Sequence, residues 1–388
     1  MFIPVYATNI SDYEKLDFDR EFFIKTVDEE KGYISYDTGK LGNSNVFPDV
    51  SSLSDENDIR NKILLRDLKG IKFSLKTGEI ICRPHCKIFN IGEREESSMK
   101  IFDFTKDHEL FLKLDGSMIT PMIPDDGNLY YTTKKGVTQI TPFIDKFVNS
   151  SDILYDDFCK EMIKNNYTPI FEWCSRSQRI VIDYPYDMLV VTAIRHMFTG
   201  EYMSSEDIEQ YVKDFNVPFN SPIKNNMTSI NEFVSTTKNL NDIEGYIVLY
   251  NNCRYKIKTD SYVSAHRALE GISFEKDIIM LICENKLDDV IPLLPENKKE
   301  GIMKFEKDFY ENVKHAVNEV IDIAKIYMKE TNNKKEFAQI INSNQYSASY
   351  ISILFSAYDI LSENTNGLIV FDRVKENIID RIIKHCIN

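Results

Sequence analysis

Hydrophobic and polar residues alternate along many short segments in the first two thirds of the chain. Alternation with turn residues between the segments predicts β-strands. Lys76-Thr-Gly78 separates two of these segments and predicts a hairpin. A helix is expected after Ser204, because Ser204 and Asp207 have the spacing of a capping box. The expected strands cover residues 71–73, 80–81, 110–112, 129–131, 169–173, 179–182, 188–194, 246–250 and 255–258.

The pattern changes near residues 268–272. Beyond this point apolar residues recur every three to four positions, which predicts helices, and strand signals are absent. The expected helices cover residues 302–327, 350–360 and 368–383. We therefore predict an α+β protein with two domains: residues 1–268, which contain antiparallel sheets, and residues 269–388, which are all helical.

Composition narrows the class of protein. Hydrophobic residues make up 43% of the 388 residues, which suits a folded protein with a large core. The net charge of −14 argues against a protein that coats nucleic acid with bulk positive charge. The seven cysteines form no C-x-x-C pair, which favours reduced thiols in a cytoplasmic protein over a structural zinc site. No apolar segment approaches the length of a membrane helix, so no membrane partner is expected.

Four short motifs have the residue types that phosphoryl chemistry needs. There is no P-loop and no kinase glycine loop. Instead, Lys113-Leu-Asp-Gly-Ser117 follows a predicted strand, Glu172 and Glu244-Gly245 lie in or beside strands, and Lys256-x-Lys258 puts two cations on one strand face. Each motif alone also fits a solvated turn or strand face. Their order and combined spacing are more specific than any one of them.

In that order, K-x-D-G-S, F-E, E-G-Y and K-x-K resemble motifs I, III, IV and V of the covalent nucleotidyltransferases, which include RNA ligases, DNA ligases and capping enzymes. Further segments between about residues 65 and 290 resemble the RNA ligase 1 family of bacteriophages. These segments are Arg83-Pro-His-Cys-Lys-Ile-Phe-Asn90, Phe171-Glu-Trp-Cys-Ser-Arg-Ser-Gln-Arg-Ile-Val181, Thr199-Gly-Glu-Tyr202 and Lys256-Ile-Lys-Thr-Asp-Ser-Tyr-Val-Ser264 with His266.

The resemblance implies a role for each matching residue. Lys113 is the nucleophile that becomes adenylylated by ATP, and Glu172 binds the ribose. Glu244 organises Mg²⁺, and Asp288-Asp289 is implied as a second metal site, although such a pair also suits a helix start. The residues implied to bind the phosphates are Lys87, Lys135, Lys256 and Lys258.

One position departs from the family. The family has Arg-Gly where this chain has Lys69-Gly70, so either Lys69 or Arg66 would contact the triphosphate.

The chemistry also requires a neutral Lys113 amine, although a free lysine is protonated at pH 7. Crowding by Lys135, Lys256, Lys258 and a metal ion is expected to favour that neutral form.

The resemblance implies an ATP-dependent RNA ligase that joins 5′-phosphate and 3′-hydroxyl ends through lysyl-AMP and RNA-adenylate. The expected partner is RNA, as single-stranded ends or a cleaved tRNA loop. The protein is expected to be a monomer that repairs RNA in the cytoplasm, which would be the cytoplasm of a host cell if the protein is viral. The helical domain would supply RNA specificity. A DNA ligase, a capping-type enzyme and a non-catalytic RNA-binding relative remain alternatives. With cations confined to one site, RNA binding is expected to be weak and strongly salt-dependent.

Overall fold

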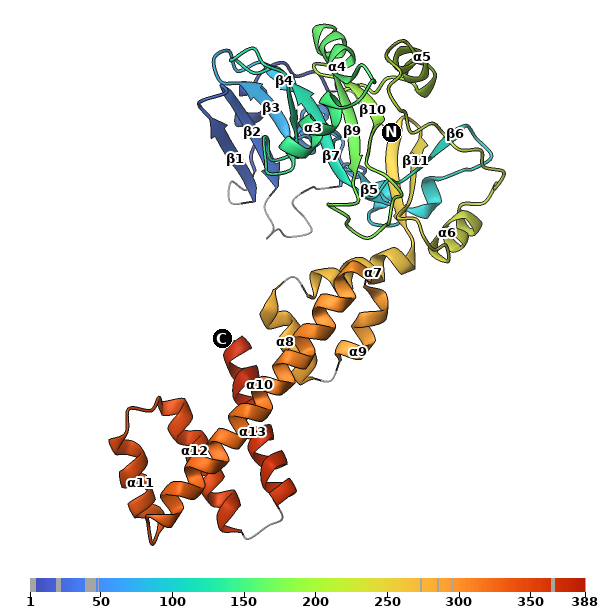
Figure 1. Ribbon diagram of the computed structural model, residues 1–388. Coiled ribbons are helices and arrows are strands. Elements are labelled where there is room, and N and C mark those ends of the chain that lie inside the picture. Colours follow the sequence, from blue (N-terminus) through green and yellow to red (C-terminus); the bar gives the residue numbers. More distant parts are fainter. Residues whose placement is uncertain are drawn as a thin grey trace. The chain divides into compact units, whose positions relative to one another are not determined.

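The chain divides into two compact units, Met1–Val263 and Ser264–Asn388 (Figure 1). The computed structural model describes residues 5–18, 22–38, 47, 49–272, 274–284, 286–294, 296–363 and 367–387. The first unit combines helices with mainly antiparallel sheets, and the second is helical throughout its described residues. The predicted α+β class is therefore confirmed. No helix in the described ranges is both long and apolar enough to cross a membrane.

Three four-stranded sheets form the first unit. One sheet has the order β1 (Phe23–Asp28), β2 (Tyr33–Thr38), β3 (Ile71–Ser74), β4 (Ile80–Cys82). Another has the order β10 (Met188–His196), β9 (Tyr167–Cys174), β7 (Ser117–Met122), β8 (Tyr130–Thr132). The third has the order β5 (Phe89–Asn90), β12 (Cys253–Lys258), β11 (Gly245–Tyr250), β6 (His108–Leu112). Among the paired strands of the described residues, β5 and β12 alone are parallel.

Amphipathic helices cover these sheets. In α4 (Tyr155–Lys164), Tyr155, Phe158, Cys159 and Met162 are buried at helical spacing, and the helix packs against β9. In α5 (Ser205–Phe215), the Ser204 side chain accepts a hydrogen bond from the Asp207 amide, as the capping-box spacing predicts. The other helices of this unit are α1 (Ser11–Glu14), α2 (Glu56–Leu65), α3 (Thr141–Asn149) and α6 (Ile230–Lys238).

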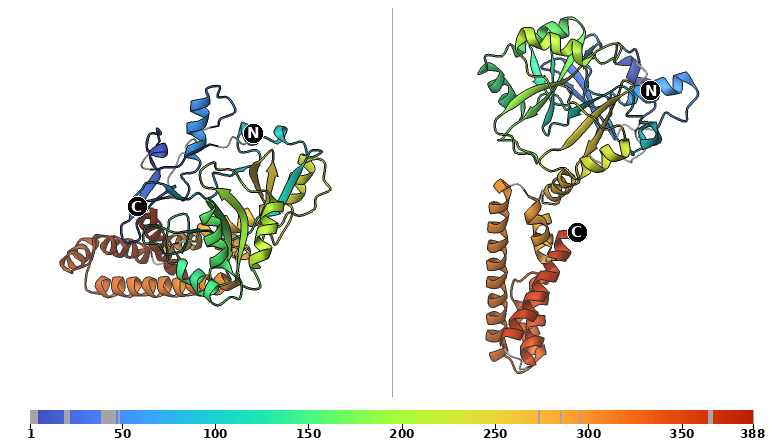
Figure 2. Two further views of the ribbon diagram at one scale, coloured as in Figure 1. Left: turned by 90° about the horizontal axis from the view of Figure 1, so that it is seen from above. Right: turned by 90° about the vertical axis from the view of Figure 1, so that its right-hand side faces the viewer.

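The second unit is built around one long helix. α10 (Glu296–Lys329) contacts α12 (Ala348–Ser362) and α13 (Gly367–Ile387), as the orange and red helices of Figure 2 show. These three helices contain the predicted helical segments 302–327, 350–360 and 368–383. The remaining helices are α7 (Asp260–Glu270), which begins at the end of the first unit, α8 (Glu275–Cys283), α9 (Leu287–Val290) and α11 (Lys334–Ser343).

Most of the predicted strands are present, but the strand predicted at 179–182 is wrong. This segment is a loop, because the amides of Val181 and Ile182 donate to Asp115 Oδ2 at 2.8 and 2.7 Å instead of pairing with a strand. The sequence pattern also missed β1, β2, β7 and several helices. In β2 the first five positions are all buried, so no alternation was available to reveal that strand.

Candidate active site

A cavity of about 270 Å³ lies among the strands that contain or adjoin the sequence motifs. Its wall includes residues of β6, β7, β9, β10, β11 and β12, so it is built from two of the three sheets. Among the described residues its only acidic side chain is that of Glu172. The lysines and arginines in the wall are Lys69, Lys87, Lys113, Lys134, Arg254 and Lys256. Such a wall favours an anionic ligand.

Lys113 stands at the end of β6, where two glycines allow strands to approach closely. Its amide donates to the carbonyl of Gly245 at 2.9 Å, which ties it to the start of β11. A Cβ at Gly116 would clash with the carbonyl oxygen of Trp173 on β9. A Cβ at Gly245, where φ is +147°, would clash with the carbonyl oxygen of Ile257 on β12. The glycines of the D-G and E-G motifs therefore bring the strands together around Lys113.

Two lysines share one buried carboxylate beside the cavity. Lys113 Nζ lies 2.8 Å from Glu244 Oε1, and Lys258 Nζ lies 3.0 Å from the same oxygen. Glu244 is 3% exposed, whereas the two lysine side chains are 22% and 29% exposed. Lys113 can therefore reach a ligand in the cavity, and Glu244 holds Lys258 beside it.

The carboxylates around Lys113 favour its ammonium form. Burial favours the neutral amine, but the carboxylates of Glu244 and Glu172 outweigh burial, so the pKa of Lys113 is raised above its usual value. The neighbouring lysines alone therefore do not make Lys113 neutral. The expectation of a neutral amine also includes a metal ion.

Two other lysines of the wall, Lys256 and Lys69, have pKa values shifted toward neutrality. Burial, followed by the charges of Lys87, Lys113 and Lys258, lowers the pKa of Lys256 to about 8. Burial and the charges of Lys134 and Lys87 lower the pKa of Lys69 to about 8. These lysines lie close enough to repel one another, which an anionic ligand would relieve.

Glu172 projects from β9 into the same cavity. Burial raises its pKa to about 8, because the nearby charges of Glu244 and Asp115 add to burial and outweigh the attraction of Lys113. A protonated carboxyl can donate a hydrogen bond, and an ionised one can bind a cation. The site can therefore present Glu172 in either form near neutral pH.

Asp115, the acidic residue of K-x-D-G-S, has a supporting position that the sequence did not reveal. Its Oδ2 accepts from the amides of Val181 and Ile182, and its Oδ1 accepts from the Tyr262 hydroxyl at 2.7 Å. The backbone amide of Asp115 donates to the Tyr184 hydroxyl at 2.8 Å. Asp115 thus fixes the loop after β9 and also Tyr262, which lies on the helix that follows the K-x-K strand.

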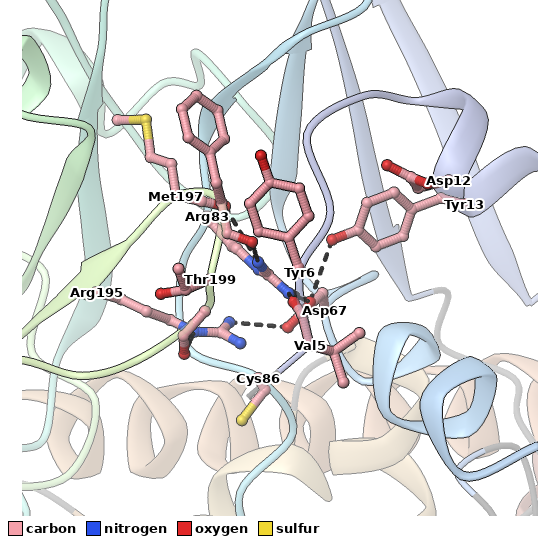
Figure 3. Close-up of polar contacts among 12 residues, drawn as sticks. Val5, Tyr6, Asp12, Tyr13, Asp67, Arg83, Cys86, Arg195, Met197 and Thr199 are labelled. Carbon is pink, nitrogen blue, oxygen red and sulfur yellow. Dashed lines mark hydrogen bonds and ion pairs between the residues drawn. The ribbon is translucent and has the colours of Figure 1, made fainter. Parts of the chain in front are cut away.

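A second buried carboxylate, that of Asp67, binds two arginines and a tyrosine (Figure 3). Asp67 Oδ2 accepts from Arg83 Nε and Nη2 at 3.0 and 2.7 Å, and Asp67 Oδ1 accepts from Arg195 Nη1 at 2.8 Å. Tyr13 donates to the same Asp67 at 3.2 Å. Burial opposes the charge of Asp67, but the two guanidinium groups lower its pKa.

The Asp67 cluster holds two loops of the cavity. Arg195 Nη1 also donates to the carbonyl of Pro84 at 2.7 Å, and Arg83 Nη2 donates to the carbonyl of Val5 at 2.9 Å. Lys69 lies two residues beyond Asp67, and Lys87 lies four residues beyond Arg83. The R-P segment of the sequence therefore fixes the loop that brings Lys87 to the cavity.

Most of the candidate site residues meet at this one place. Glu244 and Lys258 lie beside the wall that contains the others. The candidates in the wall itself are Lys69, Lys87, Lys113, Glu172 and Lys256. Arg66, the alternative to Lys69, pairs with Glu96 at 2.6 Å and lies outside this wall.

Three candidates are not among the residues that line this cavity. Lys135 is exposed, and its neighbour Lys134 lines the cavity instead. Asp288 and Asp289 are exposed on α9, in the second unit. The described residues contain no group of three or more His, Cys, Asp or Glu arranged to hold a metal ion. Sequence reasoning also missed Arg254, although it lies two residues before Lys256 and so on the same strand face.

Comparisons with known proteins agree with the motifs. A family described as RNA ligase matches residues 67–262, about half of the chain. The chain is 27% identical over 266 residues to a putative RNA ligase of Thermovibrio ammonificans, covering 64% of this chain and 67% of that protein. It is 24% identical over 263 residues to a putative bifunctional polynucleotide kinase/RNA ligase of Autographa californica nuclear polyhedrosis virus. That match covers 62% of this chain and 36% of the viral protein. A solved archaeal ATP-dependent RNA ligase is 13% identical with a TM-score of 0.46, covering 76% of each chain.

Proposed function

The chain belongs to the RNA ligase family, and from this premise we propose that it is an ATP-dependent ligase that joins a 5′-phosphate RNA end to a 3′-hydroxyl end. Residues 1–268 would perform the chemistry, and the helical residues 269–388 would recognise RNA, as single-stranded ends or a cleaved tRNA loop. The protein would act as a monomer in RNA repair. Its location would be the cytoplasm, and the cytoplasm of the host cell if the protein is viral.

The contact that supports this proposal most strongly is the Lys113–Glu244–Lys258 cluster at the cation-lined cavity. In the proposed first step, the Lys113 nitrogen forms a bond to the α-phosphorus of ATP, the bond to the pyrophosphate oxygen breaks, and the amine proton is released. An oxygen of the RNA 5′-phosphate then bonds to the phosphorus of this AMP, the bond between that phosphorus and the Lys113 nitrogen breaks, and the amine takes up a proton. Finally the 3′-hydroxyl oxygen attacks that phosphate and AMP leaves, which forms the phosphodiester.

The surrounding side chains suit this chemistry. Lys256 and Lys258 would neutralise charge on the α-phosphate, and Lys69, Lys87 and Lys134, the cavity-lining neighbour of Lys135, would act on the other phosphates. Glu172 would bind the ribose hydroxyls from the opposite sheet. Lys69, Lys87 and Lys256 line the cavity from three separate segments of the chain. This arrangement would fix the triphosphate in one orientation.

The carboxylates fit a magnesium ion. Mg²⁺ is usually held by one or two carboxylates together with substrate phosphates. Glu244 would be the main ligand, with Asp288 and Asp289 proposed for a second ion. When bound, the ion would neutralise phosphate charge and compete with Lys113 for Glu244. Loss of the Glu244–Lys113 ion pair would lower the pKa of Lys113. A lower pKa favours the neutral amine, which is the form that can attack phosphorus.

Incubation with α-labelled ATP and Mg²⁺ tests the function. Wild-type protein should acquire labelled AMP, and Lys113→Ala and Lys113→Arg should not. Lys106→Ala is the matched control, because Lys106 is a lysine of the same unit with a 69% exposed side chain. A labelled Lys113→Ala protein would show that another residue is the nucleophile.

The same assay separates the remaining alternatives. Labelling by GTP in preference to ATP would favour a capping-type enzyme, and sealing of DNA ends in preference to RNA would favour a DNA ligase. A wild-type protein that binds RNA but acquires no label would be a non-catalytic relative. Those two enzyme classes usually carry a β-barrel after the K-x-K motif, whereas the described residues of the second unit are helical.

A further inference from the structure

Arg254 extends the cationic face of β12 beyond the K-x-K motif. Along this strand Arg254, Lys256 and Lys258 are half-buried, whereas the alternating Tyr255 and Ile257 are buried in the core. Side chains with period two share one face of a strand. Arg254 and Lys256 both line the cavity, so the cationic face continues along its wall.

The guanidinium of Arg254 forms no ion pair within the described part of the chain, although the charge of Glu109 acts on it from a greater distance. Its Nε is buried without a hydrogen-bond partner, and no described carboxylate lies within 4.0 Å. The group lies 5.3 Å from the ring centre of Phe111 and 5.0 Å from that of Tyr202. Burial lowers its pKa below the usual arginine value. A half-buried cation without an ion pair, one of whose N–H groups is buried without a partner, is costly, and an anion in the cavity would offset that cost.

The register of the sheet places Arg254 on the side away from Lys113. Lys258 pairs with Gly245, whose carbonyl accepts from the Lys113 amide. Arg254 pairs with Leu249, four residues along the strand from Lys258. At about 3.3 Å per residue, the Cα atoms of Arg254 and Lys258 are roughly 13 Å apart. The order along this face is therefore Lys258 beside Lys113, then Lys256, then Arg254.

This order matches the direction of the proposed reaction. In adenylyl transfer the attacking and leaving groups lie roughly in line on opposite sides of the phosphorus. With Lys113 attacking at one end and Lys256 at the α-phosphate, the leaving pyrophosphate points toward the Arg254 end. Lys87 also lines the cavity there, and it borders a second, smaller cavity that Arg254 shares.

We propose that Arg254 binds the β- and γ-phosphates of ATP and stabilises the departing pyrophosphate. This inference rests on the proposed ligase function and adds a phosphate-binding residue to it. A guanidinium held between two rings presents its N–H groups in one plane, which suits two phosphate oxygens at once. Arg254 would therefore act on the one step that releases pyrophosphate and on its reversal.

The test compares reactions with and without pyrophosphate. Arg254→Gln should slow labelling by ATP about ten- to a hundredfold. It should slow the reverse reaction, in which pyrophosphate removes AMP from the labelled lysine, by a similar factor. Sealing of chemically pre-adenylated RNA, which involves no pyrophosphate, should stay within about twofold of wild type. Arg254→Lys should recover part of the loss, and Arg176→Gln, at an exposed arginine of the same unit, should behave as wild type.

The three reactions also distinguish the outcomes that oppose the proposal. An equal loss in all three, with Arg254→Lys no better than Arg254→Gln, would mean that Arg254 only supports the fold. Unchanged ATP labelling and unchanged pyrophosphate reversal would also overturn the inference. Wild-type protein that acquires no AMP at all would instead overturn the proposed ligase function.

Discussion

Two buried carboxylates in the first unit each hold two cations, yet they differ in what those cations can still do. Asp67 is 2% exposed and pairs with Arg83 and Arg195, whose side chains are 1% and 3% exposed. Glu244 is 3% exposed and pairs with two lysines that are 22% and 29% exposed. The charge arrangement is the same in both clusters, but the lysines of the second cluster are much more exposed than the arginines of the first, and Lys113 lines the cation-rich cavity.

The choice of cation explains the difference. Arginine has a planar fork, and the forks around Asp67 are also bonded to the carbonyls of Val5, Pro84 and Met197. Lysine is a flexible point charge that can exchange one anionic partner for another. The Asp67 cluster therefore joins distant segments permanently, whereas the Glu244 cluster holds its lysines only until a phosphate or a metal ion competes.

The largest effect on stability should come from breaking the Asp67 cluster. Asp67→Asn keeps the shape but leaves two buried guanidinium groups without an anion, so unfolding should become easier by about 3–5 kcal/mol. Urea unfolding measures this change. Asp183→Asn is the control, because its pair with Arg179 has a 57% exposed carboxylate and should contribute about 0–1 kcal/mol. Equal losses in the two variants would contradict a structural role for Asp67.

The opposite balance is expected at Glu244. Glu244→Gln should slow AMP labelling about a hundred- to a thousandfold, the range for removal of a preorganised electrostatic group. Its stability should change less than that of Asp67→Asn, because the two lysines can turn to water. Glu232→Gln, at an exposed glutamate of the same unit, is the control for the labelling rate. A large loss of stability with unchanged labelling would reverse the comparison.

The two clusters also show what the sequence can reveal. Glu244, Lys256 and Lys258 lie within two adjacent strands, so motif order and alternation were enough to place them on one site. Asp67 and Arg195 are 128 residues apart and meet only through the fold. No local pattern connects them. The loop at 179–182 failed for a similar reason, since its apolar residues look like a strand but their amides bond to the distant Asp115.

The carboxyl group of Glu172 should make the stability of the folded protein depend on pH. Its pKa of about 8 in the folded protein lies above the ordinary glutamate value, so the protonated form favours folding. This contribution is complete below about pH 4.5 and is lost as pH rises through 8. Glu172→Gln stays neutral, so it should be more stable than wild type at pH 9 by on the order of 2 kcal/mol. The difference should shrink toward pH 4.5.

Urea unfolding at a series of pH values measures the Glu172 effect. Glu209→Gln, at an exposed glutamate on α5, should differ from wild type by less than about 0.5 kcal/mol at every pH. A pH-independent difference for Glu172→Gln would mean that the carboxyl titrates alike in the folded and unfolded chains. The stabilised variant should also label more slowly with AMP, as expected where a strained group serves the site.

The smallest effect concerns two adjacent lysines that the sequence could not tell apart. Lys134 lines the cavity and lies 3.5 Å from Asp37, whereas Lys135 is exposed. Lys134→Gln should raise the ATP concentration for half-maximal labelling about three- to tenfold, the value of one partly screened charge contact. Lys135→Gln is its matched control and should stay within about twofold. The Lys134 effect should also weaken at high salt. The reverse ranking would show that Lys135 turns toward the phosphates when ATP binds, and would restore the assignment made from sequence alone.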